Sequence, residues 1–181
     1  VCNAPESNVV SAAEHSVALL LALARNVAQA HSALTQGRWE RSLWTGTELL
    51  NKTVGIVGLG RVGRLVAQRL KGFNVRILAF DPFVSSESAR AVNVEMVELD
   101  ELLSQSDFVT VHLPRTPETV GLFDAERFTK FKPGARLVNA ARGGVVIEDD
   151  LLEALESGHL GGAALDVFDT EPKLHSPLFT R

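Results

Sequence analysis

A glycine-rich turn at residues 58–63 is the segment whose residue types and spacing point most directly to chemistry. It reads Gly-Leu-Gly-Arg-Val-Gly, follows the apolar run 54–57 and precedes a stretch with apolar residues at helical intervals. In such a strand–turn–helix, the first glycine permits a tight turn, the second lets the backbone approach a pyrophosphate, and the third lets helix and strand pack closely. The helix N-terminus offers free N–H groups and the positive end of its dipole. The motif therefore predicts a dinucleotide site that uses Gly58, Gly60, Arg61, Val62 and Gly63.

Asp81 indicates which dinucleotide is bound. It ends the next apolar run, where an acidic residue accepts hydrogen bonds from the hydroxyls of the adenine ribose. A carboxylate there repels the additional phosphate of NADP, and the following Pro82-Phe83-Val84 offers no arginine to accept that phosphate. The sequence therefore predicts NAD as the cofactor. The alternative, a glycine turn in an α/β domain that binds no nucleotide, is disfavoured because strand, glycines, helix, second strand and acid follow in order.

The elements that must position these residues alternate along the chain from residue 53 onward. Short apolar runs predict strands at 53–58, 75–80, 108–112, 136–139 and 163–167, and amphipathic stretches predict helices at 62–71, 86–92, 124–130 and 148–157. Strands that are apolar on both sides and separated by helices indicate a parallel sheet covered on both faces. We therefore predict a Rossmann-type doubly wound α/β fold with ligands at the carboxyl ends of the strands.

Residues 11–35 are predicted to form one long helix ahead of the sheet. Ser11 and Glu14 have the spacing of a capping box, and apolar residues then recur at helical intervals. This apolar stripe is typical of core packing, and it also suits a contact between subunits. The apolar run 17–24 is too short to span a bilayer, so we expect no membrane partner. Residues 37–52 read as a surface loop.

Composition narrows the class of protein. The chain has 181 residues, 45% of them hydrophobic and 22% charged, which is ordinary for a globular domain. Its net charge of −4 argues against a nucleic-acid partner, which requires clustered positive charge. The one cysteine, Cys2, cannot form an internal disulfide, so a reducing cytoplasmic setting is expected. The five histidines lack metal-ligand spacing, and we predict no metal site.

Motifs distributed along the chain give it a resemblance to a known family. They are Ala13-Glu14-His15, Gly37-Arg38-Trp39, Val57 to Gly63, Val111-His112-Leu113-Pro114, Asn139-Ala140-Ala141-Arg142-Gly143-Gly144, and Ala164 to Phe168 followed by Glu171-Pro172. On these motifs the sequence resembles the D-isomer-specific 2-hydroxyacid dehydrogenases. The last two motifs are much more specific than the glycine-rich turn. The resemblance implies an NAD-dependent oxidoreductase that acts on a small 2-hydroxy or 2-oxo acid.

The resemblance also implies roles for individual residues. Arg142 matches the catalytic arginine that grips the substrate carboxylate and carbonyl, and Glu171 matches the acid that orients a catalytic histidine. Asp166 matches a residue near the nicotinamide carboxamide. The expected cofactor contacts are Gly58, Gly60, Arg61, Val62, Gly63, Asp81, His112, Ala140, Ala141, Arg142 and Asp166. A structural arginine at a strand end and an ordinary loop acid remain the alternatives for Arg142 and Glu171.

These residue types suit the implied reaction. A 2-oxo acid presents a planar carboxylate beside a ketone, and a guanidinium binds that edge with a fork of donors. The same guanidinium stabilises negative charge that develops on the carbonyl oxygen. Histidine suits the proton transfer because its pKa lies near neutrality, and an adjacent carboxylate favours its protonated form.

The family's acid–base histidine has no counterpart in this chain. In the family it belongs to a proline-histidine-leucine-glycine type segment one strand beyond the glutamate, and the chain stops at Arg181 before that point. His175 follows Glu171 too closely to take the role. We therefore expect residues 1–181 to be an NAD-binding domain excised from a longer two- or multi-domain chain. Residues 1–36 would include an interdomain helix that also supports a homodimer or higher homo-oligomer, and the isolated chain would bind cofactor without appreciable turnover.

Several activities are compatible with this resemblance. The leading expectation is oxidation of 3-phosphoglycerate at C2 to 3-phosphohydroxypyruvate, an early step of serine biosynthesis. The alternatives within the same chemistry are hydroxypyruvate or glyoxylate reductase and D-lactate dehydrogenase. A further alternative from another class is a dehydrogenase-like corepressor that senses NADH. Contacts to a substrate phosphate are expected largely outside this chain, so its sequence discriminates poorly among the enzymes.

Replacing Asp81 with Ala should weaken NADH binding and relax discrimination against NADPH, because the change removes both the ribose acceptor and the repelling charge. Calorimetric titration of the chain and its variant with NADH and NADPH measures both effects. A strong preference of the unaltered chain for NADPH would contradict the role assigned to Asp81.

Overall fold

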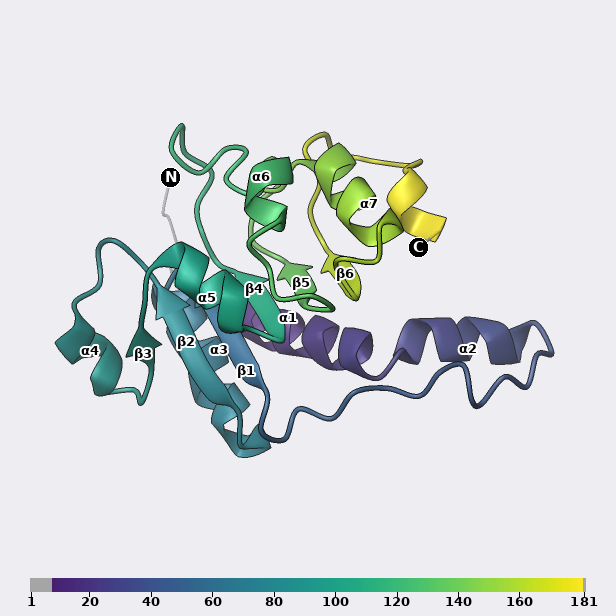
Figure 1. Ribbon diagram of the computed structural model, residues 1–181, viewed down its shortest axis with the longest axis horizontal. Helices are drawn as coiled ribbons and strands as arrows, with labels where there is room; N and C mark the ends of the chain where they lie inside the picture. The colour runs from purple at the N-terminus through teal and green to yellow at the C-terminus, as the bar shows by residue number, and fades with distance from the viewer. Residues whose placement is uncertain (1–7, 181) are drawn as a thin grey trace.

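The computed structural model describes residues 8–180, which form a six-stranded sheet flanked by helices (Figure 1). The strands lie in the order β3-β2-β1-β4-β5-β6, and every neighbouring pair is parallel. Their bounds are β1 Thr53–Val57, β2 Arg76–Phe80, β3 Glu95–Met96, β4 Phe108–Val111, β5 Arg136–Asn139 and β6 Gly162–Leu165. This order confirms the prediction of a Rossmann-type doubly wound sheet.

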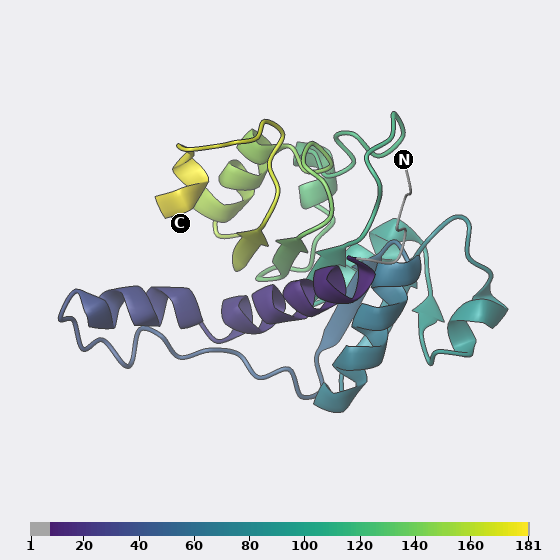
Figure 2. The ribbon, with the colours of Figure 1, turned by 180° about the vertical axis from the view of Figure 1, so that it is seen from behind.

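Helices cover both faces of the sheet. Their bounds are α1 Val9–Ala24, α2 Val27–Thr35, α3 Arg61–Leu70, α4 Ser86–Arg90, α5 Leu99–Gln105, α6 Ala125–Phe128 and α7 Glu148–Glu156, with 3-10 turns η1 Lys71–Phe73 and η2 Pro177–Thr180. Seen from behind, α1 and α3 lie against one face (Figure 2). The helices α5, α6 and α7 contribute buried residues to a second core on the other face.

The alternation of side chains along the central strands explains the two cores. In β1, Val54 and Ile56 join the core beneath α1 and α3, whereas Val57 points to the opposite core. In β4, Phe108 belongs to the first core and Val109 to the second. Because successive strand residues face opposite sides, a strand buried on both faces must be apolar throughout. This requirement is the reason that the short apolar runs predicted the strands within one or two residues of their ends.

The single helix predicted over residues 11–35 is wrong, because the chain breaks at Asn26 into α1 and α2. Asn26 has φ 53°, in the left-handed region that asparagine tolerates better than most residues, and its side-chain amide donates to the Thr45 carbonyl at 3.3 Å. The two helices meet at a bend of 63°. The capping box was also mistaken, since the helix starts at Val9 and the Ser11 hydroxyl donates to the Asn8 carbonyl at 3.1 Å.

Among the described residues no single helix is both long and apolar enough to cross a membrane. The bent pair α1 and α2 meets those two conditions only when both helices are counted together. In the structure the buried residues of α1 pack into the core beneath α3.

The strand β3 and the helix α5 are absent from the strands and helices predicted from the sequence. The acidic side chains between residues 95 and 101 lie outside, where Glu95 pairs with Arg76 at 2.9 Å. Between them, Leu99, Leu102 and Leu103 are buried in the second core. An element of seven residues provides less than two full helical turns, which is too little for its apolar period to stand out from the acids around it.

An arm formed by residues 27–46 projects from the body of the domain (Figure 1). It consists of α2 and a returning segment, and it rejoins α1 where the Thr47 amide donates to the Ala24 carbonyl at 2.7 Å. Only Ala33 of α2 is buried, whereas Leu34, Leu43 and Trp39 are exposed, the tryptophan at 79% of its surface. The arm therefore presents apolar side chains to its surroundings.

Candidate functional site

The glycine-rich turn occupies the carboxyl end of β1, at the point where the sheet order reverses between β1 and β4. Gly58 has φ +97°, and a Cβ there would lie 2.8 Å from the His112 carbonyl oxygen. A Cβ at Gly63 would lie 2.1 Å from the Gly58 carbonyl oxygen, so α3 packs directly on the turn. At Gly60, which precedes the first residue of α3, the space is open. The three glycines therefore give a tight turn, a close helix contact and an uncovered approach to the helix N-terminus.

Asp81 lies beside this turn at the end of β2. Its carboxylate accepts one hydrogen bond from the Leu59 amide at 2.8 Å and another from the Phe83 amide at 2.9 Å. Each carboxylate oxygen has further acceptor capacity, so ribose hydroxyls can still be bound there. Arg64, which the sequence analysis did not identify, braces the same turn by donating to the Leu59 carbonyl at 3.2 Å and to the Ser88 hydroxyl at 2.8 Å.

A cavity of about 920 Å³, here named the aspartate cavity, opens in front of Asp81 and the turn. Apolar side chains form much of its wall, and the acids Asp81, Glu98, Asp100 and Glu118 lie around it. Its lining residues are Gly58, Gly60, Phe80, Asp81, Pro82, Phe83, Glu98, Leu99, Asp100, His112, Leu113, Pro114, Thr116, Glu118, Thr119, Leu122 and Arg127. Apolar walls suit a flat base, and the acids disfavour an additional phosphate. The arrangement thus fits the adenosine half of NAD.

A smaller hollow of about 260 Å³, the histidine hollow, continues from His112 toward Arg142. It is lined by Asn8, Ala12, Val62, His112, Leu113, Pro114, Ala140, Ala141 and Arg142. Because His112, Leu113 and Pro114 also line the aspartate cavity, the two spaces adjoin. Val62, His112 and Ala140, which follow the strands β1, β4 and β5, therefore lie along one cleft.

The His112 ring is held neutral inside this cleft. Burial lowers its pKa from 6.5 to about 4. The ring nitrogen Nε2 lies 3.0 Å from the Thr110 hydroxyl, which is buried on β4. A neutral ring adds no charge to the cleft, so at neutral pH His112 can serve as a wall or as a hydrogen-bonding group.

A third space of about 450 Å³, the arginine hollow, brings together the two residues assigned to catalysis. Its lining residues are Arg115, Ala141, Arg142, Gly143, Val167, Phe168, Asp169 and Glu171. It shares Ala141 and Arg142 with the histidine hollow, so it lies at the other end of the same cleft. The Arg142 guanidinium donates to the Ala141 carbonyl at 2.6 Å.

Gly143 holds the loops that carry Arg142 and Glu171 against each other. A Cβ at Gly143 would lie 1.6 Å from the Phe168 carbonyl oxygen, a distance that no side chain permits. On one side of this contact, buried Asn139 fixes the Arg142 loop by donating to the Arg142 carbonyl and accepting from the Ala141 amide, both at 3.1 Å. Asn139 begins one of the family motifs but was given no role there, since an asparagine at the end of an apolar run resembles an ordinary strand terminus.

The loop that carries Glu171 is fastened from the other side by α7. Glu148, at the start of α7, accepts from the Asp169 amide at 2.9 Å and pairs with Lys173. Lys173 also pairs with Asp169 at 3.1 Å, and these two carboxylates raise its pKa, with Glu148 the larger cause. Within the loop, Glu171 accepts from the Phe168 amide at 2.9 Å. The loop conformation therefore depends on contacts that sequence spacing does not reveal.

Asp166 lies outside the lining of the three spaces of the cleft. Its carboxylate lies 3.2 Å from Nε2 of His15 on α1, and it does not line the aspartate cavity, the histidine hollow or the arginine hollow as described. His15 is exposed, and its contact with Asp166 links α1 to the end of β6. The proposed contact between Asp166 and the nicotinamide stays a prediction.

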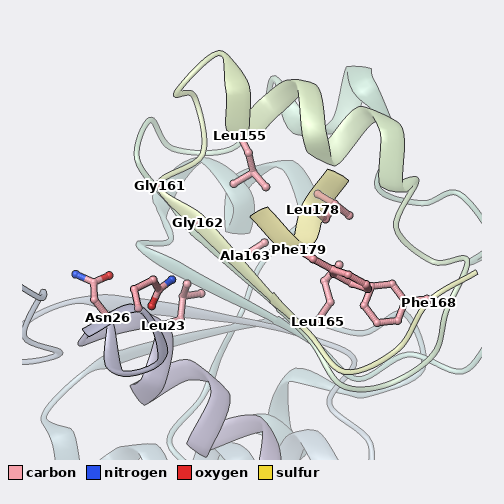
Figure 3. Close-up of a pocket in the computed structure, with 11 residues that line it drawn as sticks. Leu23, Asn26, Leu155, Gly161, Gly162, Ala163, Leu165, Phe168, Leu178 and Phe179 are labelled. Atoms are coloured by element: carbon pink, nitrogen blue, oxygen red, sulfur yellow. The ribbon is translucent and has the colours of Figure 1, made fainter. Parts of the chain in front are cut away.

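A separate hollow of about 260 Å³ lies along the outer edge of β6 (Figure 3). It is lined by Leu23 of α1, the strand β6 and Leu178 and Phe179 of η2. Phe168 borders it from the far side, where its ring meets Phe179 with centroids 5.5 Å apart. Through this ring contact, Phe168 packs the Glu171 loop against η2. None of the residues that line the hollow was predicted to bind cofactor or substrate.

Comparison with known proteins identifies the family. Residues 17–181 match the model of the D-isomer specific 2-hydroxyacid dehydrogenase, NAD binding domain. The chain belongs to the D-isomer specific 2-hydroxyacid dehydrogenases. It is 53% identical over 179 residues to D-3-phosphoglycerate dehydrogenase from Mycobacterium tuberculosis, an alignment covering 99% of this chain and 34% of that protein. The chain thus spans about a third of the length of the curated relatives it matches.

Solved structures agree with this family. NAD-dependent formate dehydrogenase from Staphylococcus aureus, in complex with NAD, superposes with a TM-score of 0.90 at 43% identity, over 97% of this chain and 53% of that one. D-lactate dehydrogenase from Escherichia coli superposes with a TM-score of 0.86 at 32% identity, over 93% and 53%. As an NAD-binding domain of a 2-hydroxyacid dehydrogenase, this chain has NAD as its cofactor, which confirms that prediction. The roles of individual residues stay predictions.

Replacing Gly60 with Ala should abolish most NADH binding in this dehydrogenase domain while leaving the fold intact. Because a Cβ there meets open space, the free energy of unfolding should stay the same or rise by up to about 1 kcal/mol. The same Cβ would occupy the approach to the pyrophosphate, so affinity should fall roughly tenfold or more.

Calorimetry with NADH and chemical denaturation measure the two effects of Gly60→Ala. Gly72→Ala, in η1, is the matched control because its Cβ also meets open space, and it should change neither quantity. Unaltered NADH affinity in Gly60→Ala would show that the pyrophosphate does not approach this glycine.

The imidazole of His112 should titrate with a pKa of about 4, and not near 6.5, when followed by NMR. The unfolded chain then binds more protons than the folded domain between these values. Stability from the neutral ring is therefore fully present above pH 6.5 and declines as the pH falls toward about 4. Titration of His112 near its ordinary value of 6.5 would contradict the burial of its ring.

Proposed function

We propose that this chain is the NAD-binding domain of an enzyme that oxidises 3-phosphoglycerate at C2 to 3-phosphohydroxypyruvate. The observation that carries the proposal is its 53% identity, over nearly the whole chain, to a D-3-phosphoglycerate dehydrogenase. Similarity to relatives of other named activity is lower, at 43% for the formate dehydrogenase and 32% for the D-lactate dehydrogenase. Oxidation of another D-2-hydroxy acid is the alternative within the same chemistry.

The order of the three spaces along the cleft supports a role in binding NAD and an acid substrate. NAD, when bound, supplies the acceptor for the hydride that leaves C2 of the substrate. The aspartate cavity and the glycine-rich turn, with Asp81, Gly58 and Gly60, would hold the adenosine and pyrophosphate. Ala140 and Ala141 lie between this part and Arg142. The substrate would thus meet the cofactor at the arginine hollow.

Arg142 and Glu171 have the chemistry needed at that end of the cleft. The guanidinium of Arg142 would bind the substrate carboxylate and stabilise negative charge on the oxygen at C2. Glu171 would orient a histidine that takes the hydroxyl proton. The described residues place no histidine in the arginine hollow, and His175 does not line it. The histidine is therefore proposed to come from another part of a longer chain that holds residues 1–181 as its NAD-binding domain.

The arm is proposed to join two copies of the enzyme. Its exposed Leu34, Leu43 and Trp39 together present a large apolar surface for a single domain. Trp39 and Trp44 also line a hollow of about 360 Å³ on the arm, which a second copy could fill. A cytoplasmic location, proposed from the lone Cys2, suits the metabolic role.

In the longer polypeptide that carries this domain, Arg142→Gln should lower kcat with 3-phosphoglycerate by about 10² to 10³, because a donor to the developing charge is lost. The NADH dissociation constant, measured by calorimetry, should change by less than a few-fold. Arg90→Gln, which removes an exposed charge on α4, is the control and should leave both unchanged.

Two outcomes would count against the proposed function. Oxidation of D-lactate in clear preference to 3-phosphoglycerate by the longer polypeptide would assign it to another activity. Full turnover by residues 1–181 alone would show that no histidine from outside this chain is needed.

A further inference from the structure

Arg115 is a second arginine in the arginine hollow, and the sequence analysis gave it no role. It follows the Val111-His112-Leu113-Pro114 motif, and it lines the hollow together with Arg142 and Glu171. Its guanidinium carbon lies over Gly144, 3.1 Å from the position a Cβ would take there. The side chain therefore extends across the loop that carries Arg142.

The loop that carries Arg115 is fixed in place before any ligand arrives. The Thr119 hydroxyl donates to the Pro114 carbonyl at 2.6 Å and accepts from the Thr116 amide at 2.8 Å. The Gly121 amide donates to the Gly144 carbonyl at 2.8 Å, which ties this loop to the Arg142 loop. Because the backbone on both sides of Arg115 is held, binding need not order this loop, which favours its use in recognition.

The charged residues that line the arginine hollow are two arginines and two acids. Among the described residues, neither Arg115 nor Arg142 has a carboxylate within salt-bridge distance. Of the two acids, Asp169 pairs with Lys173, and Glu171 accepts from the Phe168 amide within its own loop. Both guanidinium groups are therefore free of ion pairs with the described residues and can bind anionic groups on the molecule that enters the hollow.

We propose that Arg115 binds the second anionic group of the substrate, the distal phosphate, while Arg142 binds its carboxylate. This inference rests on the proposed function, and it places part of the substrate specificity inside the NAD-binding domain. Guanidinium groups suit phosphate because their planar fork of donors matches two of its oxygens. Arg115 would therefore act in specificity for the phosphorylated acid and would take no part in hydride or proton transfer.

The test compares 3-phosphoglycerate with D-glycerate, which has the same reacting atoms without the phosphate. In the longer polypeptide, Arg115→Leu should raise KM for 3-phosphoglycerate roughly tenfold to a hundredfold, the loss of one charge-assisted hydrogen bond. It should change KM for D-glycerate by less than about twofold, and kcat only a few-fold, because the reacting centre is untouched. Arg115→Lys should recover part of the loss, since the positive charge returns without the fork.

Two controls separate recognition from general damage. Arg90→Leu removes an exposed positive charge on α4, outside the cleft, and should leave both substrates unaffected. NADH affinity by calorimetry should be the same in Arg115→Leu and the unaltered protein, which also reports that the cleft is folded.

Any other outcome would contradict the role proposed for Arg115, and each would indicate a different role. Equal KM increases for both acids would place Arg115 at the carboxylate, and weakened NADH binding would place it at the cofactor. No change with either acid would make it a surface residue while the proposed function stands. If the unaltered enzyme fails to prefer 3-phosphoglycerate over D-glycerate, the proposed function itself fails, and this inference fails with it.

Discussion

Parallel pairing of the central strands is the constraint on which the rest of the structure depends. When β2, β1, β4 and β5 run in the same direction, their carboxyl ends come to one edge of the sheet. Every one of those ends contributes to the cleft: Asp81 after β2, the glycine-rich turn after β1, His112 after β4 and the Arg142 loop after β5. The chain order reverses between β1 and β4, so the loops diverge there and leave room for a ligand.

The loops at this edge are held by polar contacts that the core cannot supply. The backbone amides and carbonyls of a loop are not paired with a neighbouring strand, so side chains must provide their hydrogen-bond partners. Asp81 binds two amides, Asn139 binds an amide and a carbonyl, and Glu148 binds the amide that begins the Glu171 loop. Several residues of the site thus have a structural task that is independent of any ligand.

The two ends of the cleft differ in charge, which orients an asymmetric ligand. Four acids and one arginine line the aspartate cavity, whereas two arginines and two acids line the arginine hollow. A dinucleotide with neutral hydroxyls at its ribose suits the first end, and an anionic acid suits the second. Between them the neutral ring of His112 and the small side chains of Ala140 and Ala141 add no charge. Electrostatics alone would therefore deter an anionic substrate from the adenosine end.

The sequence by itself determined the sheet, the cofactor and the family. Its information is local: strands buried on two faces must be apolar throughout, and a dinucleotide turn needs glycines at fixed spacing, so 54–57 and 58–63 could be interpreted without a structure. Family motifs added Arg142 and Glu171. The break at Asn26 escaped prediction because asparagine in a left-handed conformation has no periodic signature, and α5 was too short for its period to be seen.

Only the tertiary structure decided which distant residues meet. Arg115 and Arg142 come from loops after different strands, and Gly143 meets Phe168 through a backbone contact that no spacing predicts. Likewise His15 contacts Asp166, although the two residues lie near opposite ends of the chain. Lys173 pairs with Glu148, which lies on α7. Contacts of this kind depend on how strands and helices pack in space, and that packing involves residues of the whole core. The conformation of the glycine-rich turn, by contrast, depends mainly on the residues of the turn itself.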